Sequence, residues 1–177
     1  VGNIVKASTG KEIEPGYSPE LKSLIEIGTL ANEASIEYQG EGKPYKTFGD
    51  PTEIALLILT EKSTAIDMIK NKWDVEYLFP FDSSRKRMSV IVKNQKSDNY
   101  QIMVKGALDI LLDLCNHYLE NGEKNVLTPE KKQKIIEVSE RFSASFAYRI
   151  LGFAMREVTN DKAKELLREK NSKLVEN

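Results

Sequence analysis

The chain has 177 residues, of which 40% are hydrophobic and 30% charged, so it is long enough to form one domain, or two small ones, around a buried core. Its formal net charge of −1 argues against sequence-independent nucleic-acid binding, which normally requires a basic excess. One cysteine and one histidine exclude an intramolecular disulfide and argue against a structural zinc site, and no apolar run approaches the ~20 residues that a membrane helix needs.

Gly, Pro and helix-capping residues indicate the first predicted secondary-structure elements. Residues 1–17 are polar and spaced by Gly and Pro, which predicts a strand and a loop. Ser18 followed by Pro19 is typical of a helix start, and the apolar residues that follow at helical spacing predict a helix to about residue 33. The segment 39–49 is predicted to be a loop.

A second helix start lies in the sequence GDPTEIAL. Asp50 is the expected cap, Pro51 fits the first turn, and Glu53 can reach back to the cap as in a capping box. A further helical stretch is predicted at about residues 64–71.

The apolar period then changes from that of a helix to that of a strand. The expected elements are strands at 75–81, 87–93 and 99–105 with a hairpin loop at 94–99, a helix at 107–114, a turn at 121–125, a helix from Thr128 to about Ser145, and a strand at 148–158. The charged tail, residues 159–177, is either a marginal helix or frayed. This order predicts one α+β domain over residues 1–177, with a twisted antiparallel β-sheet and flanking helices.

No residues suggest catalysis by this chain. His117 lies in a polar segment predicted to end a helix, and we expect it on the surface; we expect Cys115 to be buried in the core. The usual glycine-rich phosphate loops are absent from the sequence. We therefore expect no catalytic residue and no metal ligand.

Four features could bind a ligand, and each has a plain structural alternative. Lys105 and Gly106 end a strand just before a helix, where free N–H groups favour an anion, but a solvated lysine at a turn explains them equally. Phe81 beside Arg85, Lys86 and Arg87 could stack on a base, or could be a buried ring next to a charged strand edge.

The other two features are single charges. Glu53 could accept a hydrogen bond from an exocyclic amine such as that of adenine, although a capping box accounts for it without a ligand. Arg149 stands just outside an apolar strand and could equally be an ordinary surface arginine.

Taken together and in order, the segments GDPTEIAL, FPFDSSRKRMSV, VKGALDILLDLC and YRILGFAMRE resemble the nucleotide-binding domain of P-type cation-transporting ATPases, closest to the calcium-pump and sodium-pump branch. The resemblance spans about residues 19–157. It implies a twisted antiparallel sheet with flanking helices that binds ATP, as Mg-ATP in the full-length protein. It also implies a cytoplasmic domain of an integral membrane protein, whose partners are the phosphorylation and actuator domains of the pump.

The resemblance also implies a role for each matching residue. Phe81 matches the aromatic that stacks on adenine, Glu53 the carboxylate near its amino group, and Lys105, with Gly106 behind it, the lysine of the pocket floor. The remaining matches are Lys86 near the adenine or phosphates, Met88 and Leu151 in the pocket wall, and Arg149 at the phosphates or ribose.

The family's DKTGT, TGD and GDGxND segments are missing from the sequence. We therefore expect an excised domain that binds nucleotide, does not form the acyl-phosphate intermediate and touches the membrane only through its parent protein. The alternative is a regulatory or protein-interaction module that keeps the fold without nucleotide binding. The GDPTE segment favours calcium as the transported ion.

Overall fold

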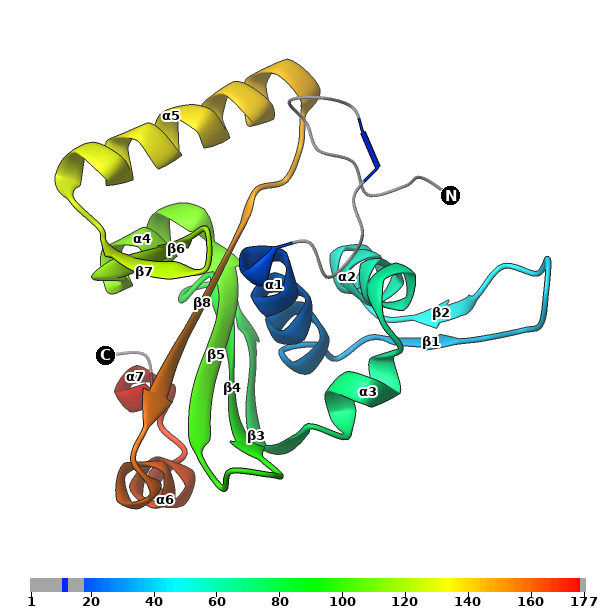
Figure 1. The fold of residues 1–177 in the computed structure, drawn as a ribbon, viewed down its shortest axis with the longest axis horizontal. Coiled ribbons are helices and arrows are strands. Elements are labelled where there is room, and N and C mark those ends of the chain that lie inside the picture. Colours follow the sequence, from blue (N-terminus) through cyan, green and yellow to red (C-terminus); the bar gives the residue numbers. More distant parts are fainter. Residues whose placement is uncertain (1–10, 13–17, 176–177) are drawn as a thin grey trace.

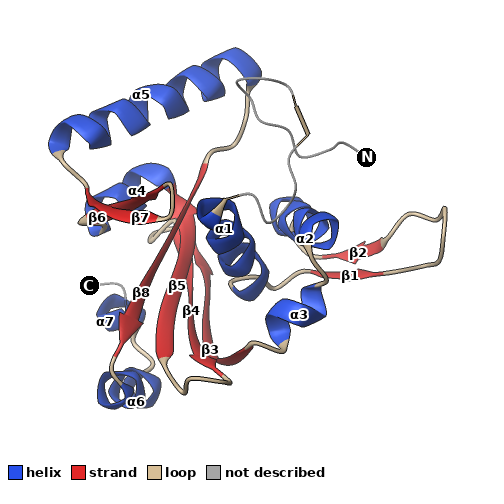
Figure 2. Cartoon of the chain, in the orientation of Figure 1, coloured by secondary structure: helices blue, strands red, loops and turns tan. Residues whose placement is uncertain are grey.

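A four-stranded antiparallel sheet, in the order β3–β4–β5–β8, forms the centre of the computed structural model, which describes residues 11–12 and 18–175 (Figure 1). Its strands are β3 (Trp73–Asp82), β4 (Arg87–Asn94), β5 (Tyr100–Ala107) and β8 (Leu151–Val158). The sheet and its flanking helices confirm the predicted α+β class (Figure 2).

Helices cover both faces of the sheet, because β4 and β5 are apolar on both faces. One face packs against α1 (Pro19–Leu30), α2 (Pro51–Ser63) and α3 (Ile66–Lys70) through side chains that include Met88, Val90 and Met103. The other packs against α4 (Leu108–Leu114), α6 (Asn160–Glu169) and α7 (Ser172–Val175) through side chains that include Ile91 and Ile102. Two cores therefore meet at the central strands.

Capping side chains start the longer helices, as the sequence predicts. The hydroxyl of Ser18 accepts from the N–H of Leu21, and the hydroxyl of Thr128 caps α5 (Pro129–Phe146). The charged tail forms α6 and α7, because Leu166 and other apolar residues of the tail are buried against the sheet. Of the two alternatives for the tail, the helix is the one observed for residues 160–169 and 172–175.

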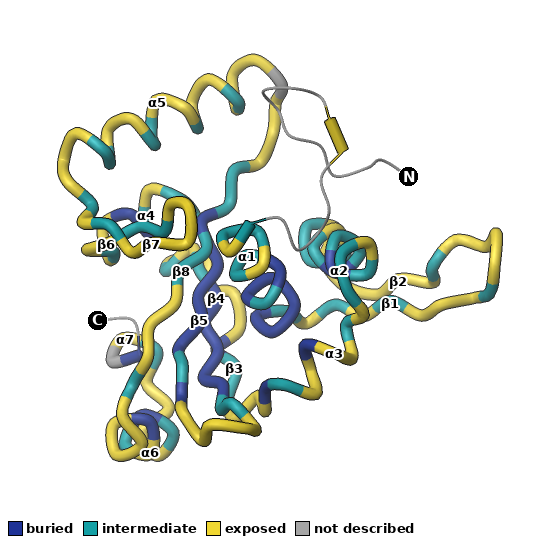
Figure 3. The backbone as a smooth tube through the Cα atoms, in the orientation of Figure 1, coloured by how far each residue is buried: buried dark blue, intermediate teal, exposed yellow. Residues whose placement is uncertain are grey.

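Two short hairpins differ from the predictions. The predicted loop 39–49 contains β2 (Lys46–Phe48), which pairs with β1 (Ser35–Glu37), and the predicted turn 121–125 contains the start of β7 (Glu123–Val126), which pairs with β6 (His117–Glu120). The β1–β2 hairpin forms an arm that projects from the domain and is largely exposed (Figure 3). Strands without a buried face carry no alternating apolar pattern, so the sequence gives no signal for them.

The predicted helix boundaries shift slightly. The first helix ends at Leu30 instead of residue 33, and β5 continues through Ala107, so that α4 begins at Leu108. The predicted strand and loop at 1–17 lie almost entirely outside the described residues. In the part of the chain that the structure describes, no helix has the length and apolar character needed to cross a membrane.

Candidate functional site

A cavity of about 570 Å³ opens where the start of α2, the β3–β4 turn, the end of β5 and the approach to β8 meet. It is lined by Glu33, Asp50, Thr52, Glu53, Leu56, Phe81, Lys86, Lys105, Gly106, Ala107, Arg149, Ile150 and Leu151. The site residues expected from the sequence are therefore brought together, with the exception of Met88. The volume lies within the range of small-molecule sites.

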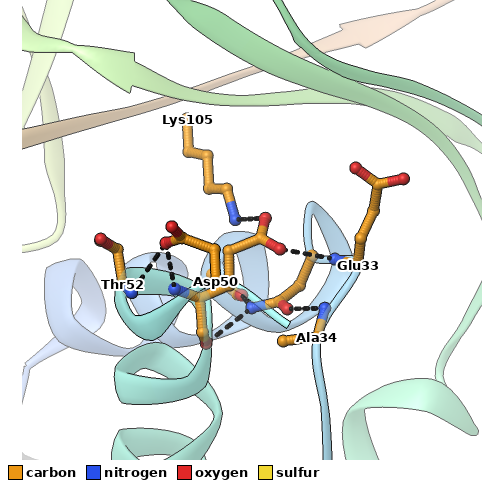
Figure 4. Close-up of polar contacts among 8 residues, drawn as sticks. Glu33, Ala34, Asp50, Thr52 and Lys105 are labelled. Atoms are coloured by element: carbon orange, nitrogen blue, oxygen red, sulfur yellow. Dashed lines mark hydrogen bonds and ion pairs between the residues drawn. The ribbon is translucent and has the colours of Figure 1, made fainter. Parts of the chain in front are cut away.

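The ion pair between Lys105 and Glu53 forms one wall of this cavity. Lys105 Nζ donates to Glu53 Oε1 at 2.6 Å (Figure 4). The two side chains are only 8% and 13% exposed. Burial lowers the pKa of Lys105, and the hydrogen bond to Glu53 opposes that shift. The Lys105 ammonium is thus held in place by the Glu53 carboxylate.

Glu53 does not act as the capping-box residue that its position predicts. Asp50 Oδ1 caps α2 by accepting from the N–H groups of Thr52 at 2.8 Å and Glu53 at 3.4 Å. The Glu53 carboxylate instead binds Lys105 through Oε1 and accepts the N–H of Glu33 at 3.2 Å through Oε2. The spacing of Asp50 and Glu53 predicts a capping box. It cannot predict the contact with Lys105, which lies 52 residues away in the sequence.

Phe81 and Lys86 reach the cavity from the two sides of the β3–β4 turn. Asp82 holds this turn: its Oδ1 accepts from the N–H of Ser84 at 2.8 Å and of Arg85 at 3.0 Å. The Ser84 hydroxyl and these N–H groups lower the pKa of Asp82. Lys86 has a left-handed backbone with φ of 53°, and Phe81 is 59% exposed, so the alternative of a buried Phe81 is wrong.

Arg85, in the same turn, and Arg87, at the start of β4, are directed elsewhere. Arg85 Nη2 donates to the carbonyl of Pro80 at 2.9 Å, and Arg87 Nη1 donates to the carbonyl of Arg85 at 3.0 Å. Neither arginine lines the cavity, whereas Lys86 does.

Gly106 is required by the backbone of the turn. A Cβ at this position would lie 2.5 Å from Arg87 Cβ and 2.6 Å from the carbonyl oxygen of Lys86. The same carbonyl accepts the N–H of Ala107 at 3.0 Å. The glycine thus lets the chain approach the Lys86 turn closely. The strand predicted to end at Gly106 continues to Ala107.

Met88 occupies the core beneath the cavity. Its side chain is fully buried with those of Val90 and Met103, and its backbone is paired with that of Lys105. Met88 is therefore absent from the cavity lining, contrary to the expectation from the sequence. Because paired residues of adjacent strands share a face, it packs beside the stem of Lys105.

Arg149 and Leu151 come from the segment that enters β8. Arg149 is exposed and its Nη1 donates to Thr52 Oγ1 at 3.4 Å, whereas Leu151 is half-buried at the start of the strand. Lys86, Lys105 and Arg149 balance the three lining carboxylates of Glu33, Asp50 and Glu53. The cavity is thus close to neutral, unlike a strongly cationic phosphate site.

The sequence reasoning missed several lining residues, among them Glu33, Thr52 and Leu56. The two in α2 neighbour Glu53 along the chain, but Glu33 follows the end of α1 and had no signal. His117 is exposed and Cys115 is half-buried, and burial raises the pKa of the Cys115 thiol. Among the described residues, no group of three His, Cys, Asp or Glu side chains could hold a metal ion.

Comparisons with known proteins place the chain in a family. Residues 20–177 match the family model of the P-type ATPase cytoplasmic domain N. The chain is 31% identical over 176 residues to calcium-transporting ATPase 1 of Lactococcus lactis and 38% identical over 135 residues to calcium-transporting ATPase 1 of Bacillus cereus. These matches cover 99% and 76% of this chain but only 19% and 14% of the two relatives, so the chain spans less than a fifth of their length.

Proposed function

The chain belongs to the family of the P-type ATPase cytoplasmic domain N, and on this premise we propose that it binds an adenine nucleotide in the cavity beside Phe81. The observation that carries the proposal is the convergence of one exposed aromatic ring, one buried ion pair and two exposed cations from four separate segments. An exposed ring supplies a stacking surface, and the cations supply charge for phosphates.

The proposed pose follows from the position of each group. The base stacks on Phe81 with its polar edge towards the largely buried pair of Glu53 and Lys105. The phosphates extend towards Lys86 and Arg149, which are exposed. Leu56 and Leu151 supply apolar walls.

We also propose the context in which this domain acts. The relatives are calcium-transporting ATPases and are more than five times as long as the matched region, which supports a longer calcium-transporting parent protein with membrane spans. There the bound Mg-ATP would give its terminal phosphate to an aspartate of a neighbouring phosphorylation domain, and an actuator domain would complete the assembly. We assign Mg²⁺ to no residue of this chain, because the described residues offer no ligand cluster.

The near-neutral cavity predicts modest affinity. Base stacking contributes roughly 1–3 kcal/mol, and charged hydrogen bonds roughly 1.5–3 kcal/mol each before ordering costs. We therefore expect a dissociation constant no tighter than high micromolar for the chain alone, where about −4 kcal/mol corresponds to ~1 mM. Because the base supplies most of the contact, AMP and ADP should bind within a small factor of ATP.

Backbone-amide NMR during titration with AMP, ADP and ATP tests the proposal. We expect shifts at Phe81 and Gly106, and their loss in Lys105→Ala. Submicromolar binding, a strong preference for the triphosphate, or shifts that avoid both residues would contradict the proposed site. Binding of no nucleotide at all would favour a protein-interaction module of the same fold.

A further inference from the structure

Asn32, the second residue after α1, ties three parts of the backbone together. Its Nδ2 donates to the carbonyl of Gly28 at 2.8 Å and to the carbonyl of Glu53 at 3.1 Å, and its Oδ1 accepts the N–H of Ala34 at 2.9 Å. A single amide thus uses both donors and its acceptor to join the end of α1, the first turn of α2 and the start of the β1–β2 arm.

This arrangement fixes the donor that Glu33 offers to Glu53. Glu33 lies between Asn32 and Ala34, and its N–H donates to Glu53 Oε2 at 3.2 Å. The carboxylate of Glu33 points away from the Lys105 ammonium (Figure 4). Because Asn32 also holds the carbonyl of Glu53, it sets both ends of this contact.

The Glu53 carboxylate is consequently held by two donors, one on each oxygen: Lys105 Nζ on Oε1 and the Glu33 N–H on Oε2. A carboxylate has about four lone-pair positions, so about two remain for a ligand in the cavity that Glu53 lines. Their direction is set by the two donors already in place, as in other sites whose ligand contacts depend on supporting hydrogen bonds.

We propose that Asn32 is a positioning residue for base recognition, which aims the free lone pairs of Glu53 at the exocyclic amine of the nucleotide base. The inference rests on the proposed nucleotide binding. It selects for a base with an amine at that edge, because a base with a carbonyl there would present an acceptor to an acceptor.

Packing of α1 on α2 has a separate support away from the cavity. Thr29 Oγ1 and Thr60 Oγ1 lie 2.8 Å apart in a buried hydroxyl pair, and neither residue lines the cavity. Thr60→Val removes this interaction without touching Asn32 or Glu53, and so provides a matched control for loosening of the same helix pair.

The experiment compares AMP with inosine monophosphate, in which a carbonyl replaces the amine, by NMR titration of the full chain and its variants. Asn32→Ala should weaken AMP binding about five- to tenfold, the effect of one lost hydrogen bond, and leave the inosine nucleotide nearly unchanged. Asn32→Ser keeps an acceptor for the Ala34 N–H but cannot bridge to α2, so it should lose discrimination in the same way while preserving the local turn. Thr60→Val should lower the melting temperature and retain discrimination.

Unchanged discrimination in Asn32→Ser, or an equal loss in Thr60→Val, would overturn the inference; the serine variant decides the matter if Asn32→Ala does not fold. A wild-type chain that binds neither nucleotide would refute the proposed function instead. In that case the side-chain carboxyl resonance of Glu53, measured without ligand, tests the role of Asn32. A change of this resonance in Asn32→Ser but not in Thr60→Val would support the positioning role. An unchanged resonance in Asn32→Ser would refute it.

Discussion

A double-mutant cycle on Glu53 and Lys105 tests whether the cavity wall is formed before any ligand arrives. Lys105→Met keeps an unbranched apolar chain close to the length of the lysine stem and removes the charge, while Glu53→Gln keeps the shape of the carboxylate. Each single variant leaves a charge that is 87% or more buried without its partner at 2.6 Å. Fully buried pairs lose about 3–5 kcal/mol in this way, and the remaining exposure here lowers the expected loss to about 2–3 kcal/mol.

The double variant should recover most of that stability, because replacing both charges by neutral groups removes the unpaired charge. We expect a coupling energy of about 1.5–3 kcal/mol from urea unfolding curves, with unchanged slopes. The exposed pair of Lys131 and Glu120, whose atoms lie 2.7 Å apart, is the matched control. Its coupling should stay below about 1 kcal/mol and vanish in high salt.

Two results would refute a preformed cavity wall: a Glu53–Lys105 coupling energy below about 0.5 kcal/mol, or a double variant that is no more stable than the single ones. Either result would mean that the ion pair does not form in the free protein. If Glu53 and Lys105 contact the base as proposed, nucleotide binding should remain lost in the double variant, because restored stability does not restore these two groups.

Three further predictions address the turn and the stacking surface. Gly106→Ala should lower the free energy of unfolding by about 3 kcal/mol, because its Cβ would meet backbone atoms that cannot move aside. In Gly28→Ala the Cβ would lie 3.4 Å from Leu56, so this control variant should not destabilise the chain. Equal effects of the two substitutions would contradict the steric explanation. Asp82 has a pKa below its usual 3.8, so its carboxylate contributes stability above pH 3.8 that is lost as the pH falls through the lowered pKa. The difference in stability between wild type and Asp82→Asn should therefore disappear in acid, and a constant difference from pH 5 to 2 would refute this assignment. Phe81→Ala should leave stability nearly unchanged but weaken AMP binding by about 1–3 kcal/mol. Tyr38→Ala removes an exposed ring outside the cavity lining and should leave AMP binding unchanged. Equal losses of affinity in the two variants would exclude stacking on Phe81.

The parts of the fold that could be predicted are those with local causes. Caps at Ser18, Asp50 and Thr128 place their helices, and the apolar runs of β4 and β5 identify strands buried on both faces. The β1–β2 and β6–β7 hairpins could not be predicted in this way, because no buried face imposes a period on them.

The candidate site shows the same division. The order of four motifs predicts about half of the cavity residues, but it does not predict Glu33. The interactions could not be predicted either, since the partner of Glu53 lies in another element and the local pattern of Glu53 favours a cap. Met88 belongs to the same motif as Phe81 and Lys86, yet its position in β4 directs its side chain into the core. A motif places a group of residues near the cavity, but the face of the strand on which each side chain lies determines whether that side chain lines the cavity.

The cavity is lined both by a central strand of the sheet and by two connections outside it. Lys105 and Gly106 belong to β5, whose amides are paired on both sides, whereas Lys86 lies in a hairpin turn and Arg149 in the segment before β8. Opening free energies are largest in central strands and smallest in such connections. The base would therefore meet a wall that is rigid before binding, and the entropy lost on binding would fall on the two segments that carry the phosphate-directed cations.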